Sequence, residues 1–256
     1  MRGRVYFREN TMKKSIISGL IGLSFATPIY SADNIGLDDV VVTATRTSQP
    51  SEAVIADVTV IDAEEIERGG QTTFVELLQQ QPGIEITSTG GAGTQSGIFL
   101  RGTNTGHVVV LVDGMRINSA TAGITAFENL PLSQIERIEI LRGPATSLYG
   151  QNAIGGVIQI FTKKGSGKPR VFANLGYGTY NTRKGEAGVH GSLGDTSFAL
   201  SLSASDTDGF SAYDTKNVLF KDKDGYRNLS VSANLSQKLA EGHEIGVQFF
   251  ESDGNA

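Results

Sequence analysis

The sequence predicts an α+β domain followed by the first antiparallel strands of a transmembrane β-barrel. Two observations lead to this prediction. Residues 55–165 mix short apolar strands with capped helical segments, whereas residues 166–256 contain about five segments in which apolar and small polar residues alternate. A strand that faces lipid on one side and a wet lumen on the other shows this alternation. A soluble β-sandwich with one solvated face would also explain the alternation, but not the N-terminal features described below.

Composition excludes several classes of protein. The 256 residues contain no cysteine, which rules out disulfides, zinc–thiolate sites and thiol nucleophiles. Glycine is abundant (32) and proline scarce (6), as in a turn-rich β protein. The formal net charge of −5 gives no support to nucleic-acid binding. No apolar run after the N-terminus reaches the roughly 18 residues of a membrane-spanning helix.

Residues 1–32 read as a leader that contains a signal peptide. Met12-Lys13-Lys14 is a basic start, and residues 16–26 form a short apolar core. Cleavage is expected near Ser31 or Ala32, and Met12 is the expected true start. An uncleaved anchor is the alternative, although the apolar core is short for spanning a membrane. The protein is therefore expected to be exported.

The α+β domain has local signals for each element. Asp62 and Glu65 begin one helix, which Gly69-Gly70 ends, and Thr73 with Glu76 forms a capping box for the next. Ser133 with Glu136 has the same spacing and predicts a further helical turn, and Asp113-Gly114 predicts a hairpin turn. Strands are expected at Val58–Ile61, Ile84–Thr87, Ile98–Gly102, His107–Val112, Arg137–Leu141 and Val157–Thr162.

The barrel strands are expected to carry apolar side chains on their lipid face. A tight turn at Gly194-Asp195 and a long connection from Asp206 to Tyr226 fit the short and long loops of such barrels. Five strands cannot close a barrel, which takes about eight or more. We therefore expect an N-terminal fragment that ends at Ala256 in a polar tail. The apolar positions of the first four strands are Val171, Ala173, Leu175, Tyr177, Ala187, Val189, Leu193, Phe198, Leu200, Leu202, Ala204, Leu229, Val231, Ala233 and Leu235, with Ile245, Val247 and Phe249 in the fifth.

Residues 135–164, IERIEILRGPATSLYGQNAIGGVIQIFTKK, resemble the end of the plug domain of TonB-dependent outer-membrane receptors. Taken alone, the segment could also be a strand-turn-strand of an ordinary soluble domain. Residues 90–118, GGAGTQSGIFLRGTNTGHVVVLVDGMRIN, are similar to the cobalamin receptors of that family. The resemblance implies a plug domain inside an outer-membrane barrel.

The implied function is capture of a scarce large ligand and its import into the periplasm with energy from the inner membrane. Cobalamin is the favoured ligand; a ferric siderophore or haem is the alternative, and so is a non-transporting surface receptor. No covalent cofactor is implied. An enzyme is disfavoured because there is no Ser/His/Asp constellation and the three histidines are widely separated.

The resemblance also assigns a coupling segment within residues 33–54, the TonB box and its linker. Its β-branched run is suited to pairing with a sheet edge of the periplasmic TonB-type energy-coupling protein. A first core strand of the α+β domain is the alternative. The segment comprises Asp39, Val40, Val41, Val42, Thr43 and Ala44.

Two loops rich in small residues are expected to face the ligand, because the family's plug apices point outward. The first, residues 88–97, is not a dinucleotide site, since Ser96 replaces the last glycine of the motif and a strand follows instead of a helix. The second is residues 119–127. The candidate ligand-binding residues are Thr89, Thr94, Gln95, Ser96, Ser119, Thr121 and Thr125.

Two further sets of charged residues are candidates. Arg101 and Arg142 each end a strand before a glycine; similar arginines in the family face barrel carboxylates, and exposed surface arginines are the alternative. Asp222 and Asp224 have a D-x-D-G spacing that could hold Ca²⁺ together with Asp214. A solvated acidic turn would have the same sequence.

Overall fold

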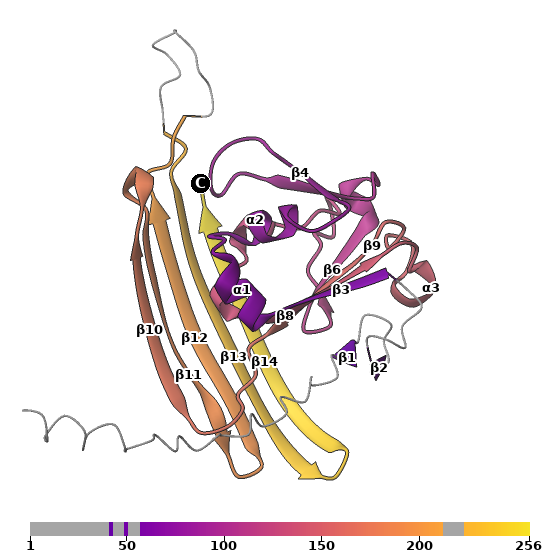
Figure 1. Cartoon of the computed structure of the whole chain (residues 1–256), viewed down its shortest axis with the longest axis vertical. Helices are drawn as coiled ribbons and strands as arrows, with labels where there is room; N and C mark the ends of the chain where they lie inside the picture. The colour runs from indigo at the N-terminus through magenta and orange to yellow at the C-terminus, as the bar shows by residue number, and fades with distance from the viewer. Residues whose placement is uncertain (1–40, 43–48, 51–56, 212–222) are drawn as a thin grey trace, which may run out of the picture. The chain divides into compact units, whose positions relative to one another are not determined.

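The computed structural model describes residues 41–42, 49–50, 57–211 and 223–256, all within one unit of the chain, Asp39–Ala256. A mixed sheet with strand order β3-β8-β9-β6-β7 organises the α+β domain, and a second sheet, β10 to β14, follows it (Figure 1). We call the second one the wall sheet. No helix in these described ranges is long and apolar enough to cross a membrane.

The mixed sheet joins strands that lie far apart in the sequence. Strands β6 and β9 run parallel, while β3, β8 and β9 pair antiparallel, with Ile61 opposite Ile138 and Ile140 opposite Ile158. The strands are β3 (Asp57–Asp62), β6 (Val108–Val112), β7 (Met115–Arg116), β8 (Ile135–Arg142) and β9 (Gly156–Thr162). A separate hairpin pairs β4 (Ile84–Ser88) with β5 (Ser96–Leu100). The six strands expected in this domain are confirmed, each to within about two residues.

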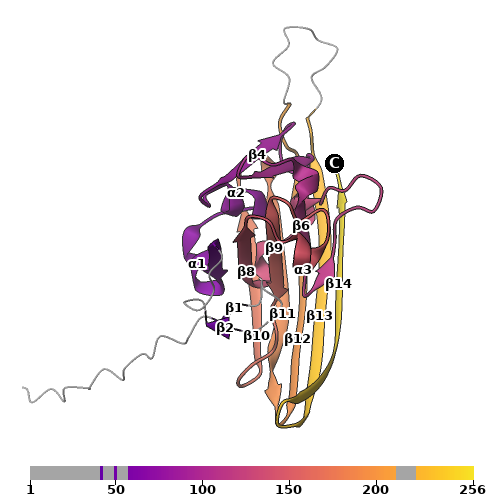
Figure 2. The ribbon, with the colours of Figure 1, turned by 90° about the vertical axis from the view of Figure 1, so that its right-hand side faces the viewer.

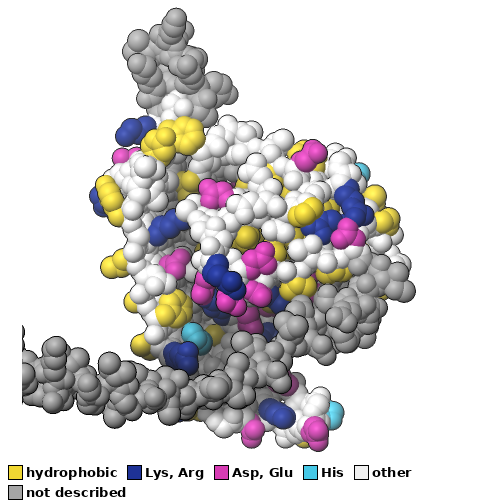
Figure 3. All heavy atoms as spheres, in the orientation of Figure 1, with side chains coloured by type: hydrophobic (Ala, Val, Ile, Leu, Met, Phe, Trp, Pro, Cys, Tyr) yellow, Lys and Arg dark blue, Asp and Glu magenta, His cyan; other side chains and the backbone are white. Residues whose placement is uncertain are grey.

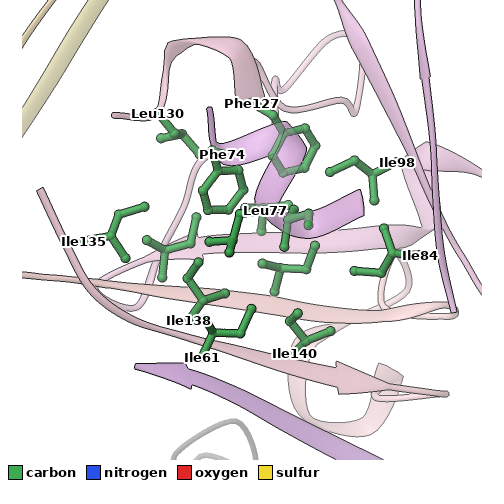
Figure 4. Packing of buried hydrophobic residues seen from close by; sticks show 14 of the residues in the cluster. Ile61, Phe74, Leu77, Ile84, Ile98, Phe127, Leu130, Ile135, Ile138 and Ile140 are labelled. Atoms are coloured by element: carbon green, nitrogen blue, oxygen red, sulfur yellow. The ribbon is translucent and has the colours of Figure 1, made fainter. Parts of the chain in front are cut away.

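Helices α1 (Ala63–Gly69) and α2 (Phe74–Gln79) begin at the predicted caps. The Asp62 side chain accepts a hydrogen bond from the Glu65 amide at 2.8 Å, and Gly70 ends α1 in the left-handed region at φ 69°. The Thr73–Glu76 capping box is present. Both helices pack on one face of the mixed sheet, where the rings of Phe74 and Phe127 stack with centroids 5.9 Å apart (Figure 4). The opposite face has a smaller cluster around Val109, Leu141 and Val157, beside α3 (Thr146–Tyr149).

The third expected capping box is wrong. The chain forms a 3-10 turn, η4 (Leu132–Gln134), whose cap is Pro131 and receives no side-chain hydrogen bond. Strand β8 then begins at Ile135, so Glu136 cannot be the third residue of a helix. Burial of Ile135 in the core decides the conformation here. Two other 3-10 turns, η2 (Thr105–His107) and η3 (Phe127–Asn129), lead into and out of the loops flanking β6 and β7.

The wall sheet is a simple antiparallel meander (Figure 2). Its strands are β10 (Arg170–Tyr177), β11 (Arg183–Leu193), β12 (Thr196–Thr207), β13 (Tyr226–Ala240) and β14 (His243–Asn255), with η5 (Thr179–Asn181) between the first two. The five expected strands and the Gly194-Asp195 turn are confirmed. The expected polar tail is wrong, because β14 continues to Asn255 by pairing along β13, with Arg227 opposite Asn255.

The wall sheet exposes its apolar side chains and buries its small polar ones, the reverse of the arrangement in a soluble protein. Leu175 is 93% exposed and Val171 83% exposed, whereas Ser230 is fully buried and Ser232 is 4% exposed. Apolar side chains accordingly stand along the outer edge of the sheet in Figure 3. The predicted alternation, apolar outward and small polar inward, is confirmed.

The α+β domain is fastened to the polar face by hydrogen bonds. The Gln134 side chain donates to the Ser230 carbonyl at 3.2 Å, and the Asn234 amide donates to Thr162 Oγ1 at 2.8 Å and to the Lys163 carbonyl at 2.9 Å. Neutral amides and hydroxyls supply most of these bonds, which suits an interface where a buried unpaired charge would be costly. Further bonds join Gln248 to Asp113, Ser252 to Asn129, Tyr226 to Glu128 and Asn129, and Lys184 to Thr72.

Asp113 joins the hairpin turn to the end of β9. It has φ 48° and Gly114 has φ 84°, the two positive values of a type I′ turn. Its carboxylate accepts from the Thr162 amide at 3.0 Å and from Thr162 Oγ1 at 2.5 Å. Burial raises the pKa of Asp113, and the two bonds from Thr162 offset part of that effect.

We expect Gly156→Ala to destabilise the α+β domain by about 2–4 kcal/mol. Gly156 has φ 152°, and an added Cβ would lie 2.1 Å from the Leu141 carbonyl oxygen and 2.5 Å from Leu100 Cδ2. Amide hydrogen exchange of β9 in the full-length protein measures the effect. Gly106→Ala is the matched control, because nothing lies within 4 Å of its Cβ position. Equal protection in the two variants would contradict the prediction.

We expect Asp113→Asn to be at least as stable as the wild type at neutral pH and Asp113→Ala to be less stable. Asparagine can still accept from the Thr162 amide and can donate to Thr162 Oγ1, without a buried charge. The pKa of Asp113 is raised in the folded state. Its contribution to the free energy of unfolding is therefore fully present below the unfolded-state pKa of about 4 and is lost as pH rises through the folded-state pKa. Wild-type stability relative to Asp113→Asn should therefore fall with rising pH in urea titrations; a constant difference would refute the assignment.

Candidate functional site

A cavity of about 670 Å³ lies between the α+β domain and the polar face of the wall sheet. On one side it is lined by the start of α2, the glycine-rich loop between β4 and β5, and the η3–η4 segment; on the other by β11, β12 and β13. A smaller cavity of about 320 Å³ lies near Asn234 and Gln248 and contains none of the predicted ligand residues. The larger cavity has a volume typical of small-molecule sites, which span about 300–1,000 Å³.

The glycine-rich loop packs against the aromatic side chains of Tyr226, at the start of β13, and Phe210, in the connection after β12. An added Cβ at Gly93, where φ is 82°, would lie 2.0 Å from the Tyr226 ring, and one at Gly91 would lie 3.2 Å from the Phe210 ring. The ring centroids of Phe210 and Tyr180 are 5.3 Å apart. Glycine is therefore required at position 93 for contact between backbone and ring, and the rings give one end of the cavity an aromatic lining.

Glu128 is a half-buried carboxylate in the cavity wall. It belongs to η3, and its Oε2 atom is buried without a hydrogen-bond partner. Burial raises the pKa of Glu128, and the backbone amides of Glu128 and Ser96 offset part of that rise. The Gln71 Oε1 and Ser133 Oγ atoms, which belong to other lining residues, are also buried without a partner. The cavity thus presents hydrogen-bonding capacity that the protein does not use.

The predicted ligand-binding residues are divided by the structure. Thr94 and Ser96 line the cavity, while Thr89 and Gln95 are exposed beside it in the same loop. Ser119 and Thr121 lie exposed on the second loop, joined by a hydrogen bond of 3.2 Å, and do not line the cavity. Thr125 is 3% exposed, which leaves its hydroxyl inaccessible in this conformation. A ligand-binding role for the set stays a prediction.

Arg101 and Arg142 share one carboxylate of their own domain. Asp57 pairs with Arg101 Nη2 through one oxygen and with Arg142 Nη1, at 3.4 Å, through the other. Arg142, with a side chain only 4% exposed, also donates to the Pro82 carbonyl at 2.8 Å and to Thr59 Oγ1 at 2.7 Å. The expected contact with barrel carboxylates stays a prediction, and the hydrogen bonds that the described residues do make to the wall sheet come from other residues.

Two predicted sites lie largely outside the described residues. Of the coupling segment, Val41–Val42 is described: it forms strand β1, paired antiparallel with β2 (Gln49–Pro50). Asp39, Val40, Thr43 and Ala44 lie outside. Asp214 and Asp222 also lie outside, and no cluster of acidic or histidine side chains that could hold a metal ion occurs in the described part of the chain. The calcium site stays a prediction.

Sequence reasoning missed most of the cavity wall. Tyr180, Phe210 and Glu128 lie in or beside loops, where no periodicity marks them. The available signal was the pair of glycines in the 88–97 loop, which indicated close approach of another group without identifying it. Ser133 carried only a capping signal, and Gln71, between α1 and α2, carried none.

Known proteins resemble this chain in sequence over both the α+β domain and the wall sheet. The family model described as the TonB-dependent receptor plug domain matches residues 50–157. The vitamin B12 transporter BtuB of Photobacterium profundum is 34% identical over 247 residues, covering 96% of this chain, and BtuB of Vibrio vulnificus (strain YJ016) is 38% identical over 232 residues, covering 89%. The chain spans 40% and 37% of the lengths of these relatives.

Solved structures share the fold. The siderophore receptor PirA of Pseudomonas aeruginosa matches with a TM-score of 0.56 and 28% identity, covering 77% of this chain and 35% of that one. The ferric enterobactin receptor PfeA of the same organism, solved with enterobactin, matches with a TM-score of 0.61 and 23% identity, covering 78% and 33%. The matched plug domain and the relatives that extend through the wall strands point to one family. The chain therefore belongs to the TonB-dependent receptors, and residues 50–157 are its plug domain.

Proposed function

We propose that the receptor to which this chain belongs binds cobalamin at the cell surface and imports it into the periplasm. One observation carries the choice of cargo: similarity to vitamin B12 transporters runs through both the plug domain and the wall strands, over 96% of the chain at 34% identity. The cavity supports it, since its unused polar atoms suit a polar arm that projects from a large ligand.

The wall sheet supports a location in the bacterial outer membrane, with lipid against its apolar face. Large apolar side chains of all five strands are more than half exposed, as at Leu193, Leu229 and Val247. Water would oppose such a surface, whereas the hydrocarbon of a bilayer favours it. The signal peptide that the sequence predicts in residues 1–32 would direct export.

Coupling would proceed through residues 39–44, captured as an added strand by a TonB-type protein. The backbone of Val41–Val42 already forms a strand, which supports this mode of recognition. No covalent chemistry is required, and the relatives are transporters and receptors. The ligand must have different affinities for two states of the receptor, one with the coupling strand hidden and one with it available. A ligand that binds both states equally well does not shift the equilibrium between them.

A ferric siderophore is the alternative cargo, because solved receptors with the same fold include siderophore receptors. Haem belongs to the same alternative. A surface receptor that binds without transporting would share every structural feature described above, and differs only in lacking coupled uptake.

Cells that carry the full-length gene should accumulate radiolabelled cyanocobalamin well above a deletion strain. Ferric enterobactin supplied to the same cells should not support iron uptake. Cobalamin uptake equal to that of the deletion strain would contradict the proposed cargo, and ferric enterobactin uptake would favour the alternative.

Val41→Pro should reduce cobalamin uptake about tenfold or more and leave surface binding unchanged. Proline removes the backbone N–H that a paired strand needs. Val41→Ala, which keeps that N–H, is the matched control and should retain most uptake. Unchanged uptake in the proline variant would indicate that the segment does not couple transport.

A further inference from the structure

Glu128 lies outside both loops expected to contact ligand, yet it faces the same cavity as Thr94 and Ser96. It sits on η3, between the second loop and η4. Its neighbours are fixed: Tyr226 Oη donates to the Glu128 carbonyl at 3.0 Å and lies 2.7 Å from Asn129 Oδ1. The main chain that carries Glu128 is therefore anchored to β13 of the wall sheet.

The lining carries unused acceptor atoms. Glu128 Oε2 and Gln71 Oε1 are buried and have no hydrogen-bond partner, and the Ser133 hydroxyl is likewise unpaired. Buried acceptors without partners cost free energy, about 1–3 kcal/mol each, unless water or a ligand supplies a donor. The cavity is consequently matched to a molecule that brings N–H or O–H groups.

The charge of the lining is unbalanced. Among the described lining residues, the carboxylates are Glu76, Glu128, Glu186 and Asp206, and the one ammonium is that of Lys184. Glu76 is used in the helix cap, Asp206 pairs with Arg227 at 2.9 Å, and Lys184 donates to the Thr72 carbonyl at 2.7 Å. Glu128 is the carboxylate among them whose oxygen is buried and unpaired. An anionic ligand would be repelled here, and a neutral or cationic one would not.

We propose that Glu128 is a specificity-determining residue, whose Oε2 accepts a hydrogen bond from an N–H group on a neutral or cationic arm of the ligand. The inference rests on the proposed function and deepens it. The primary amides around a corrin ring are donors of this kind, whereas ferric catecholate siderophores are anionic. The cavity is smaller than a whole corrinoid, so it receives a projecting amide arm while the ring stays outside.

Glu128 also connects this contact to the plug core. The Ser96 amide, at the start of β5, lies against its carboxylate, and the adjacent Phe127 stacks on Phe74 of α2. A ligand arm on Oε2 would thus act on three elements of the plug at once.

The test is equilibrium binding of cyanocobalamin to the purified full-length receptor, comparing wild type, Glu128→Gln and Glu85→Gln. Glu85 is exposed on β4 and outside the cavity, so its variant loses the same charge elsewhere. Glu128→Gln should bind about 10- to 100-fold more weakly, the usual cost of losing a charge-assisted hydrogen bond. Glu85→Gln should bind like wild type.

The pH profile separates recognition from a merely structural role. Because burial raises the pKa of Glu128 above its usual value, wild-type affinity should fall as pH drops through the raised value, and Glu128→Gln should show no such change in that window. Glu76, Glu186, Asp206, Lys184 and Tyr226 face the same cavity and remain in both proteins, so the difference between the two profiles reports Glu128.

Each outcome decides between the hypotheses. If wild type binds cyanocobalamin and Glu128→Gln binds equally with the same pH profile, the inference is wrong and the proposed function stands. If wild type does not bind cyanocobalamin, both are wrong. Ferric enterobactin should fail to compete with cyanocobalamin on wild type; competition would overturn the electrostatic argument.

Discussion

The plug is attached to the wall sheet mainly through polar side chains, because the wall directs most of its apolar side chains the other way; Phe250, which packs against the plug core, is an exception. Ser201, Ser203, Ser230 and Ser232 are buried against the plug, whereas Leu175 and Val171 point outward. Apolar burial therefore cannot be the main attraction between the two parts. Hydrogen bonds with defined geometry take its place, and they fix the position of the plug while leaving polar space that water or a ligand can occupy.

The same constraint explains where the attachment is firm and where the cavity forms. Towards the end of β9, Asn234 holds Thr162 and Lys163, and Gln248 holds Asp113. At the glycine-rich loop, the contacts are instead between backbone and aromatic rings, and the atoms around Glu128 are left unpaired. The interface thus has paired polar groups near the end of β9 and unpaired ones around Glu128, where the cavity lies.

Ion pairs, and not neutral hydrogen bonds, hold strand β3 of the plug. Asp57 begins β3, an edge strand of the mixed sheet, and two arginines share its carboxylate. Arg142 is buried with its Nη2 atom unpaired, so the cluster carries excess positive charge that one carboxylate does not balance.

The sequence by itself determined the local structure: the caps at Asp62 and Thr73, the Asp113-Gly114 turn, the runs of β8 and β9, and the alternation of the wall strands. Each depends on residues a few positions apart, whose periodicity and turn chemistry can be read directly. Only the tertiary structure decided which polar groups meet. Thr162 and Asn234 are 72 residues apart, Glu128 has no local pattern, and Ser133 met the spacing of a cap that core burial of Ile135 overrode. Partners so distant are chosen by packing, because no short-range interaction connects them.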